Sequence, residues 1–371
     1  MKTILISCLC LTHLAYGNIT WNTPINLSDT TTEAYNTVIG LDANGNAVCV
    51  WNDANGGAII VEGSTKLYGQ SWTPATGQNI DNSTVPLTEA PVLSVDSQGN
   101  ALAIWRSDNG GAMSLRYSYK PFGLAWTPGY ITMNYVILYQ VVMNPPGQGT
   151  AVWIQGSSLF ASSFNGSTWT TPVQIDTTAF GPSLAVDPNG NATVVWIDTA
   201  TIQIKSATLL FGMSWSTPTV VETFSSGFLG VTSVGVDASG NVVALWSSDS
   251  GIQSATKLFN QSWSAVTTFP NSGTSESTFP VIAVDPQGNA VALWQNDTNN
   301  AIMSASKPFA QPWSNAVTIG GGIYPQIAVD SCGTAVGVWE VGTNTVQTAF
   351  KALGADWMIS QSYPAANGGG S

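Results

Sequence analysis

A ten-residue segment, DPQGNAVALW at residues 285–294, recurs with variations along the whole chain. Each copy contains a glycine and, six positions later, a tryptophan. The glycines are Gly45, Gly99, Gly147, Gly190, Gly240, Gly288 and Gly333, and the tryptophans are Trp51, Trp105, Trp153, Trp196, Trp246, Trp294 and Trp339. Seven copies with an average spacing of 48 residues indicate seven repeats of one supersecondary unit.

A second motif, Ser-Trp-Ser/Thr-x-Pro or a variant of it, alternates with the first. Its tryptophans are Trp21, Trp72, Trp126, Trp169, Trp215, Trp263, Trp313 and Trp357, again 48 residues apart on average. The two series together include all 15 tryptophans of the chain. Large aromatic side chains at periodic strand positions are typical of a packed core, so we predict that the tryptophans pack inside the protein rather than bind a ligand.

The sixth repeat predicts four short strands, at residues 280–284, 290–294, 301–307 and 313–319. Between the first two, Asp285 can accept hydrogen bonds from the turn backbone and Gly288 can adopt a positive φ. The inner two strands are apolar on both faces, so both faces must be covered. Four antiparallel strands in each of seven repeats predict an all-β fold, a seven-bladed β-propeller over residues 18–363. No repeat has the polar character of a cap, which favours a closed ring.

Closure of the ring leaves one strand motif in excess, because the outer-strand motif occurs eight times and the rest of the repeat seven times. The segment at residues 20–24 keeps the Trp-x-x-Pro pattern, whereas the segment that begins at Trp357 lacks the proline. We therefore predict that the N-terminal segment supplies the outer strand of the last blade.

The two ends of the chain differ from the repeats. Residues 1–17 combine Lys2, an apolar stretch and a small-x-small sequence at Ala15–Gly17, which together predict a secretory signal peptide. The protein is thus expected to be secreted or periplasmic. No later apolar run has the length of a membrane span. Residues 364–371 predict a disordered tail.

Composition excludes several kinds of chemistry. Removal of residues 1–17 leaves eight basic and 21 acidic residues, a formal charge of −13 that disfavours nucleic acid and anionic lipid as partners. The only histidine, His13, leaves with the signal peptide, which excludes Ser-His-Asp catalysis and imidazole zinc sites. We expect no metal and no cofactor. Cys49 is predicted to be a buried thiol and Cys332 to lie in a turn, with a disulfide between them as the alternative.

Two further series of charged residues follow the repeat. Aspartates begin the turns, and we predict that they cap those turns rather than bind calcium: Asp42, Asp96, Asp187, Asp237, Asp285 and Asp330. Lysines share another position, where we predict solvated strand ends: Lys66, Lys120, Lys257, Lys307 and Lys351.

The segment from Asp285 to Trp294 resembles the Asp-box repeat of secreted bacterial propellers of the sialidase-like group. An Asp box reads Ser-x-Asp-x-Gly-x-x-Trp, whereas here the glycine lies three residues and the tryptophan nine residues after the aspartate. Sialidases hold the substrate carboxylate with three arginines. This chain has two, Arg106 and Arg116, so the resemblance implies the fold but not the enzymatic activity.

The segments that join each outer strand to the next inner strand are the candidate binding region. They vary most in length between repeats, and in a propeller they gather around the central opening on one face. Their aromatic and acidic side chains suit sugar binding. The candidate ligand-binding residues are Tyr35, Glu89, Phe180, Glu276, Phe279 and Tyr324. Phe279 and Tyr324 each precede a proline, so the alternative for these two is that they plug the starts of the inner strands.

We predict a non-enzymatic binding module for a glycan or a protein surface. Two alternatives remain. One is a glycoside hydrolase that uses a pair of glutamates from Glu33, Glu89, Glu222 and Glu276. The other is a structural surface or adhesion protein.

Overall fold

The computed structural model describes residues 25, 27–28, 33–55, 58–81, 89–108, 113–224, 230–270, 272–273, 277–342 and 345–364. The predicted signal peptide (residues 1–17), the N-terminal strand motif (residues 20–24), Glu276 and residues 365–371 of the predicted tail lie outside the described residues.

The described residues form 28 strands in seven antiparallel sheets of four, and each sheet is a blade built from one continuous stretch of chain. Blades 1 to 3 comprise β1 (Glu33–Leu41), β2 (Ala47–Asn55), β3 (Ala58–Lys66), β4 (Trp72–Asn79); β5 (Val92–Val95), β6 (Ala101–Asp108), β7 (Met113–Lys120), β8 (Thr127–Thr132); and β9 (Ile137–Asn144), β10 (Gln148–Gln155), β11 (Ser158–Phe164), β12 (Val173–Asp176). Blades 4 and 5 comprise β13 (Phe180–Val186), β14 (Ala192–Asp198), β15 (Gln203–Leu209), β16 (Thr219–Thr223); and β17 (Thr232–Val236), β18 (Val242–Ser248), β19 (Gly251–Lys257), β20 (Thr267–Thr268). Blades 6 and 7 comprise β21 (Ser277–Val284), β22 (Ala290–Asn296), β23 (Ala301–Lys307), β24 (Val317–Gly321); and β25 (Ile323–Val329), β26 (Ala335–Val341), β27 (Thr345–Lys351), β28 (Met358–Pro364).

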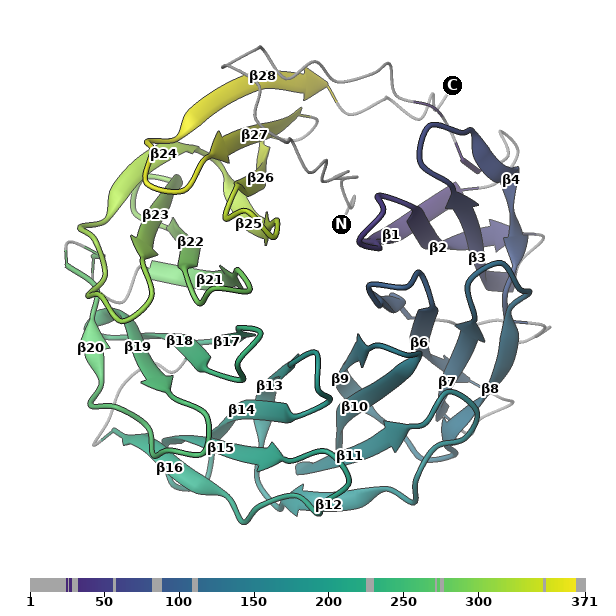
Figure 1. Ribbon diagram of the computed structural model, residues 1–371, viewed down its shortest axis with the longest axis horizontal. Helices are drawn as coiled ribbons and strands as arrows, with labels where there is room; N and C mark the ends of the chain where they lie inside the picture. The colour runs from purple at the N-terminus through teal and green to yellow at the C-terminus, as the bar shows by residue number, and fades with distance from the viewer. Residues whose placement is uncertain are drawn as a thin grey trace.

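The blades stand in a ring around a central opening, with the first strand of each blade innermost and the fourth outermost (Figure 1). This arrangement confirms the predicted seven-bladed propeller. One face carries the turns between first and second strands and between third and fourth strands, and we call it the turn face. The opposite face carries the connections from each outer strand to the next inner strand, and we call it the connection face. Among the described residues we find no helix with the length and hydropathy that a membrane crossing requires.

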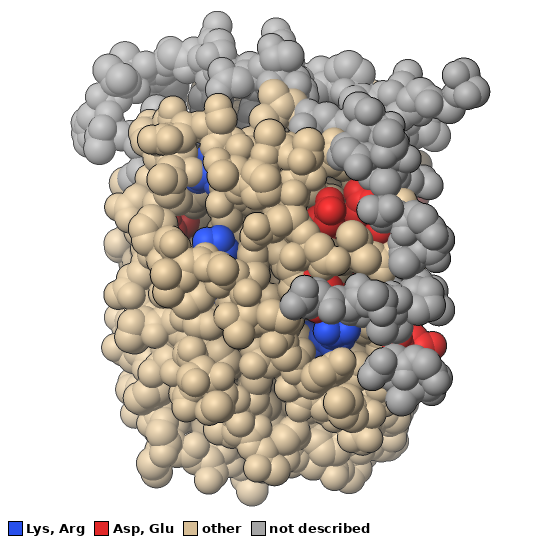
Figure 2. Space-filling model, turned by 90° about the vertical axis from the view of Figure 1, so that its right-hand side faces the viewer, with Lys and Arg blue, Asp and Glu red and all other residues tan. Residues whose placement is uncertain are grey.

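Charged side chains are sparse on one edge of the ring. Figure 2 presents the edge that lies on the right of Figure 1, and most of its described surface is uncharged. This view agrees with the composition, in which 8% of residues are charged. The packing of the blades therefore depends mainly on apolar burial.

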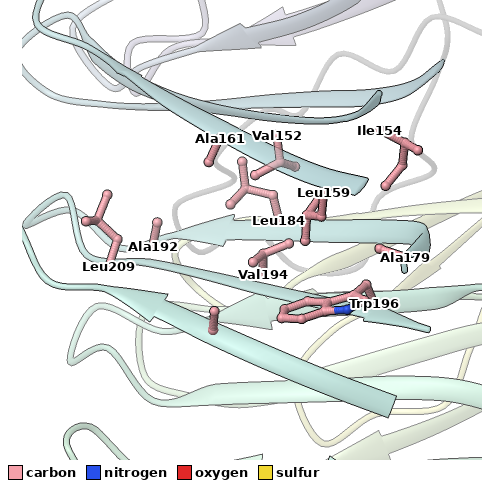
Figure 3. Close-up of a cluster of buried hydrophobic side chains, with 11 residues drawn as sticks. Val152, Ile154, Leu159, Ala161, Ala179, Leu184, Ala192, Val194, Trp196 and Leu209 are labelled. Atoms are coloured by element: carbon pink, nitrogen blue, oxygen red, sulfur yellow. The ribbon is translucent and has the colours of Figure 1, made fainter. Parts of the chain in front are cut away.

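The core lies between adjacent blades. Figure 3 shows one such layer, in which side chains of blade 3 face those of blade 4; they include Val152, Leu159, Leu184 and Trp196. The seven second-strand tryptophans are at most 2% exposed: Trp51, Trp105, Trp153, Trp196, Trp246, Trp294 and Trp339. The prediction that these tryptophans form the core is confirmed.

In the outer-strand series, the indoles of Trp263, Trp313 and Trp357 form hydrogen bonds to the preceding blade. The indole Nε1–H of Trp263 donates to Ser206 Oγ of the preceding blade at 2.7 Å, and Trp313 donates to Ser254 Oγ at 2.8 Å. Trp357 makes the same bond to Ser304 Oγ at 2.9 Å. A serine of the preceding blade thus satisfies the indole N–H in these three cases, whereas the indole N–H groups of Trp126 and Trp169 have no hydrogen-bond partner among the described residues.

The outer strand of the last blade is β28, so the prediction that the N-terminal segment supplies it was wrong. β28 pairs with β27 through Phe350↔Met358 and Ala349↔Ile359. The short turn between these strands brings them together at little cost in chain entropy, whereas the N-terminal segment would have to close a loop of the whole chain. Trp357 provides the interblade hydrogen bond without the proline that we took as a requirement.

The aspartate turns have the predicted form. Asp285 Oδ1 accepts the backbone N–H groups of Gln287 and Asn289 at 3.0 and 2.8 Å, and its Oδ2 accepts the Asn289 side-chain amide at 2.8 Å. The Asn289 Oδ1 atom in turn accepts the N–H of Phe309, which ties the two turns of one blade together. The same pattern around Asp42, Asp96, Asp187 and Asp237 confirms that these carboxylates cap their turns.

The two cysteines are not linked. Cys49 is fully buried and Cys332 is exposed, and both are thiols, which excludes the disulfide alternative. Burial raises the pKa of the Cys49 thiol to about 12.

Candidate functional site

The candidate aromatic residues lie where the inner strands begin, and a bulge distorts most of these starts. The pairing of the first and second strands shifts register near Tyr35, Phe180, Thr278 and Ile323. In each of these bulges one residue has a left-handed φ, between 48° and 56°: Asn36, Gly181, Phe279 and Tyr324. In blade 3, Leu138 has a similar φ of 49°.

The bulges of blades 4, 6 and 7 share a local cause. The left-handed residue is followed by proline in Gly181-Pro182, Phe279-Pro280 and Tyr324-Pro325. Proline has no N–H to give to the ladder, and a bulge is one of the few places where a strand tolerates it.

The same backbone conformation is nearly free for one of these residues and costly for the others. Gly181 adopts it without a steric penalty, because glycine has no Cβ. Phe279 and Tyr324 adopt it at a cost of about 1–3 kcal/mol each, the range for residues held in sparsely populated regions. Bulky residues that keep a strained backbone are often found at binding sites.

Phe279 and Tyr324 meet across the boundary between blades 6 and 7. Their ring centroids are 5.2 Å apart and their planes are at 73°, an edge-to-face pair. Phe279 is 42% exposed and Tyr324 37% exposed. The rings therefore shield each other in part but remain open to solvent, whereas side chains that only plug the strand starts would be buried.

A polar network centred on the buried Gln295 links the two strand starts. The Tyr324 N–H donates to Gln295 Oε1 at 3.1 Å. The Gln295 side-chain amide donates to Asp297 Oδ1, which also accepts the Thr278 hydroxyl at 3.0 Å. Gln295 is buried, so its orientation is constrained. The backbone at the start of blade 7 is thus anchored to blade 6, next to the residue that precedes Phe279.

Glu89 lies elsewhere on the connection face, in a cluster between blades 2 and 3. Its carboxylate forms an ion pair with Arg106. The Arg106 Nη1–H donates to the Val136 carbonyl at 3.1 Å, and its guanidinium lies 5.0 Å from the centroid of the Tyr135 ring. The Tyr139 hydroxyl donates to the Ala90 carbonyl at 2.7 Å, and burial raises the pKa of Tyr139 to about 12. Glu89 is therefore neutralised by its partner and does not act as an isolated anion.

The remaining predicted residues are spread around the ring. Phe180 is the first residue of β13 and is 46% exposed, and Tyr35 is half-buried in β1 next to Asn36. The inner strands that carry these residues border the central opening in Figure 1. Of the predicted set, the structure brings Phe279 and Tyr324 into contact and places Tyr35, Glu89 and Phe180 on other blades.

Two carboxylates have structural roles. Glu222 Oε2 accepts the indole N–H of Trp246 at 2.9 Å and lies near the amide of Gln253, and burial raises the pKa of this glutamate. Asp81 forms an ion pair with Arg116 at 2.8 Å, and both side chains are buried. Asp81 and Glu222 are thus committed to contacts inside and between blades.

Sequence reasoning missed two features of this face. It did not identify the contact of Arg106 with Glu89 and Tyr135, because ion pairs between distant segments leave no local pattern. It also missed Leu138, which has a left-handed φ of 49° and is 42% exposed, because no proline marks its bulge. Within the described residues there is no group of three His, Cys, Asp or Glu side chains that could hold a metal ion.

Comparisons with known proteins show a likeness of architecture. No family model and no curated protein matches the chain. Solved structures that resemble it include a protein of unknown function from Dyadobacter fermentans, at 14% identity and a TM-score of 0.47, over 91% of this chain and 96% of that one. A lectin of Aleuria aurantia in complex with Fucα1-6GlcNAc has 15% identity and a TM-score of 0.46, over 75% and 96% of the two chains. The NanB sialidase of Streptococcus pneumoniae has 10% identity and a TM-score of 0.43, over 89% and 78%. At these values the likeness extends to the propeller architecture and no further.

Proposed function

We propose that the protein is a binding module for a neutral glycan, which it holds on the connection face with aromatic side chains at the starts of the inner strands. The observation that carries the proposal is the Phe279–Tyr324 pair. Both rings are exposed, both are held on a strained backbone, and the buried Gln295 accepts the backbone N–H of Tyr324. Gly181 shows that this fold can build the same bulge without strain.

The ligand class follows from the character of these side chains. The C–H faces of a sugar ring stack on aromatic rings, and its hydroxyl groups bond to nearby polar groups. The Tyr324 hydroxyl and the backbone groups around the bulges supply such partners. The charge of Glu89 is cancelled by Arg106, which favours a neutral ligand over a cationic one. Affinity should therefore depend only weakly on salt.

Among the carboxylates that the structure describes, Glu89 and Glu222 fit binding better than hydrolysis. A glycoside hydrolase needs two carboxyl groups roughly 5–10 Å apart with room for the sugar between them. Glu222 is held by Trp246, and Glu89 is held by Arg106. The signal peptide predicted at residues 1–17 would bring such a module to the periplasm or the outside of the cell, where glycans are displayed.

A glycan array probed with the mature protein, together with a panel of chromogenic glycosides, tests this proposal. We expect binding to one group of neutral glycans and no release of chromophore. Turnover of any glycoside would contradict the proposal, as would an array on which no glycan binds. The same array probed with Tyr324→Ala, checked for folding by circular dichroism, should lose its signal.

A further inference from the structure

The turn face carries a ring of exposed apolar side chains. Every turn between a third and a fourth strand, except that of blade 3, has a large apolar residue at its tip. These six residues, which we call the apolar tips, are 42% to 60% exposed: Tyr68, Phe122, Phe211, Phe259, Phe309 and Leu353. Leu124 and Met213, each two residues after a tip, are exposed still further. Large apolar groups that share one exposed face mark an interaction surface.

The fold does not require apolar residues at these positions. Blade 3 builds the same turn from Asn165, Gly166, Ser167 and Thr168. Asn165 Oδ1 accepts the backbone N–H groups of Ser167 and Thr168 at 3.0 and 2.8 Å. Polar residues of this kind are the usual choice in turns, so the apolar tips of the other six blades need a reason other than the turn itself.

The apolar tips are held in place on their own blades. In blade 6 the N–H of Phe309 donates to Asn289 Oδ1 at 3.1 Å, and the ring lies against Gly288, where no space remains for a Cβ atom. Phe122 and Phe211 make the equivalent hydrogen bonds, each at 3.0 Å, and lie on the equivalent glycines. Because the rings are already fixed on one side, a partner that covers the exposed side would cost them little conformational freedom.

Charge is distributed unevenly between the two faces. Among the described residues, the strand bounds place five lysines and seven aspartates at the turn face, a net charge of −2. Six of these aspartates accept hydrogen bonds from their own turns. The rest of the described chain contains three basic and twelve acidic residues, a net charge of −9, most of them toward the connection face. Two copies of the chain would therefore repel each other least if their turn faces met.

We propose that two copies of the chain associate through their turn faces. The apolar tips of one copy pack against those of the other about a twofold axis, so that the same surface serves both copies, as such an interface requires. With roughly 200 Å² for a fully accessible aromatic side chain, the tips and their apolar neighbours offer about 800 Å² per copy, which is the area that each partner buries in a typical stable interface.

The dimer would present its two connection faces in opposite directions. A consequence that rests on the proposed function is that one dimer bridges two glycan-bearing surfaces. Two linked sites raise the avidity for such surfaces without any new contact to the sugar.

Sedimentation equilibrium of the mature chain tests the association. Interfaces of this size have dissociation constants from micromolar to picomolar, so we expect a dimer at about 100 µM. The double variant Phe122→Glu/Phe211→Glu, checked for folding by circular dichroism, should associate at least about tenfold more weakly. The matched control is Met133→Glu, which changes a similarly exposed apolar residue of the connection face and should dimerise like the wild type.

A second measurement avoids substitution altogether. Cys332 is an exposed thiol in a turn of blade 7 on the turn face, whereas Cys49 is buried. Attachment of a polyethylene glycol maleimide to Cys332 should block the turn face and give a monomer.

A wild-type chain that stays monomeric at the highest concentration would overturn the proposal. A dimer that both the double variant and the Cys332 adduct leave intact would do so too, as would a monomer that sediments with phosphatidylcholine vesicles, because the apolar tips would then meet a membrane. The double variant should bind glycan like the wild type, and Phe279→Ala should dimerise like the wild type. A failure of the glycan proposal is thereby distinguishable from a failure of this one.

Discussion

The strained backbone at Phe279 leads to a prediction about two substitutions at that position. Phe279→Ala and Phe279→Gly both remove the ring, so they lose the same contact with Tyr324. They differ in their tolerance of the φ of 48°, which an alanine keeps only at a steric cost and a glycine keeps freely. At an ordinary strand position alanine is the more stable of the two. At position 279 we expect the glycine variant to be more stable than the alanine variant.

The magnitude follows from two opposing terms. A left-handed conformation costs an L-residue with a Cβ about 1–2 kcal/mol. Glycine loses roughly 0.5–1 kcal/mol relative to alanine, because its unfolded chain is freer. The glycine variant should therefore be more stable than the alanine variant by about 0.5–1 kcal/mol. Val281 lies in the same strand as Phe279 and pairs with Leu293 of β22. At this position the alanine variant should be more stable than the glycine variant by a similar amount.

Urea unfolding of the four variants, Phe279→Ala, Phe279→Gly, Val281→Ala and Val281→Gly, measures this reversal. The difference between the two positions should be about 1–2 kcal/mol, which is well within the resolution of such curves. If alanine is the more stable variant at both positions, the backbone at Phe279 stores no strain. The main reason to assign this ring to ligand binding would then be lost.

Three other predictions concern the scaffold. Trp246→Ala should destabilise the protein by about 3–5 kcal/mol, because the indole is fully buried between blades 4 and 5; a loss below about 1 kcal/mol in urea unfolding would contradict the packing. A thiol reagent at pH 8 should modify Cys332 in the folded mature chain and reach Cys49 only after unfolding, because burial raises the pKa of Cys49 to about 12; rapid modification of both thiols would be the opposing result. Truncation before Met358 removes β28 and exposes the edge of β27, so light scattering should detect association; a monodisperse monomer would argue against β28 as the outer strand.

Much of the fold could be predicted because its repeat uses residues with narrow roles. Gly288 supplies the positive φ of its turn, and Trp294 is a large apolar side chain that is fully buried between blades 5 and 6. Ring closure was harder to predict, since Trp21 matches the motif better than Trp357 does. Chain connectivity, which the motif does not encode, decided in favour of Trp357.

The candidate site could be predicted only in part. Phe279 and Tyr324 could be identified as candidates because each is an aromatic residue before a proline. Their left-handed φ could not be predicted, because bulky residues rarely adopt this conformation. Their mutual contact depends on the angle between blades, which no local pattern specifies. The lysine series was predicted in part: Lys307 ends β23, but its side chain is half-buried.

The most direct test of the proposed function compares two exposed phenylalanines on opposite faces of the ring. Phe279 is 42% exposed on the connection face and Phe309 is 45% exposed on the turn face, so the two substitutions remove similar surface. We expect Phe279→Ala to weaken binding of an array-selected glycan by at least about tenfold in calorimetry, which corresponds to a loss of about 1.4 kcal/mol. Phe309→Ala should bind like the wild type. Unchanged binding by Phe279→Ala, with a loss in Phe309→Ala, would contradict the proposal and place the site on the turn face.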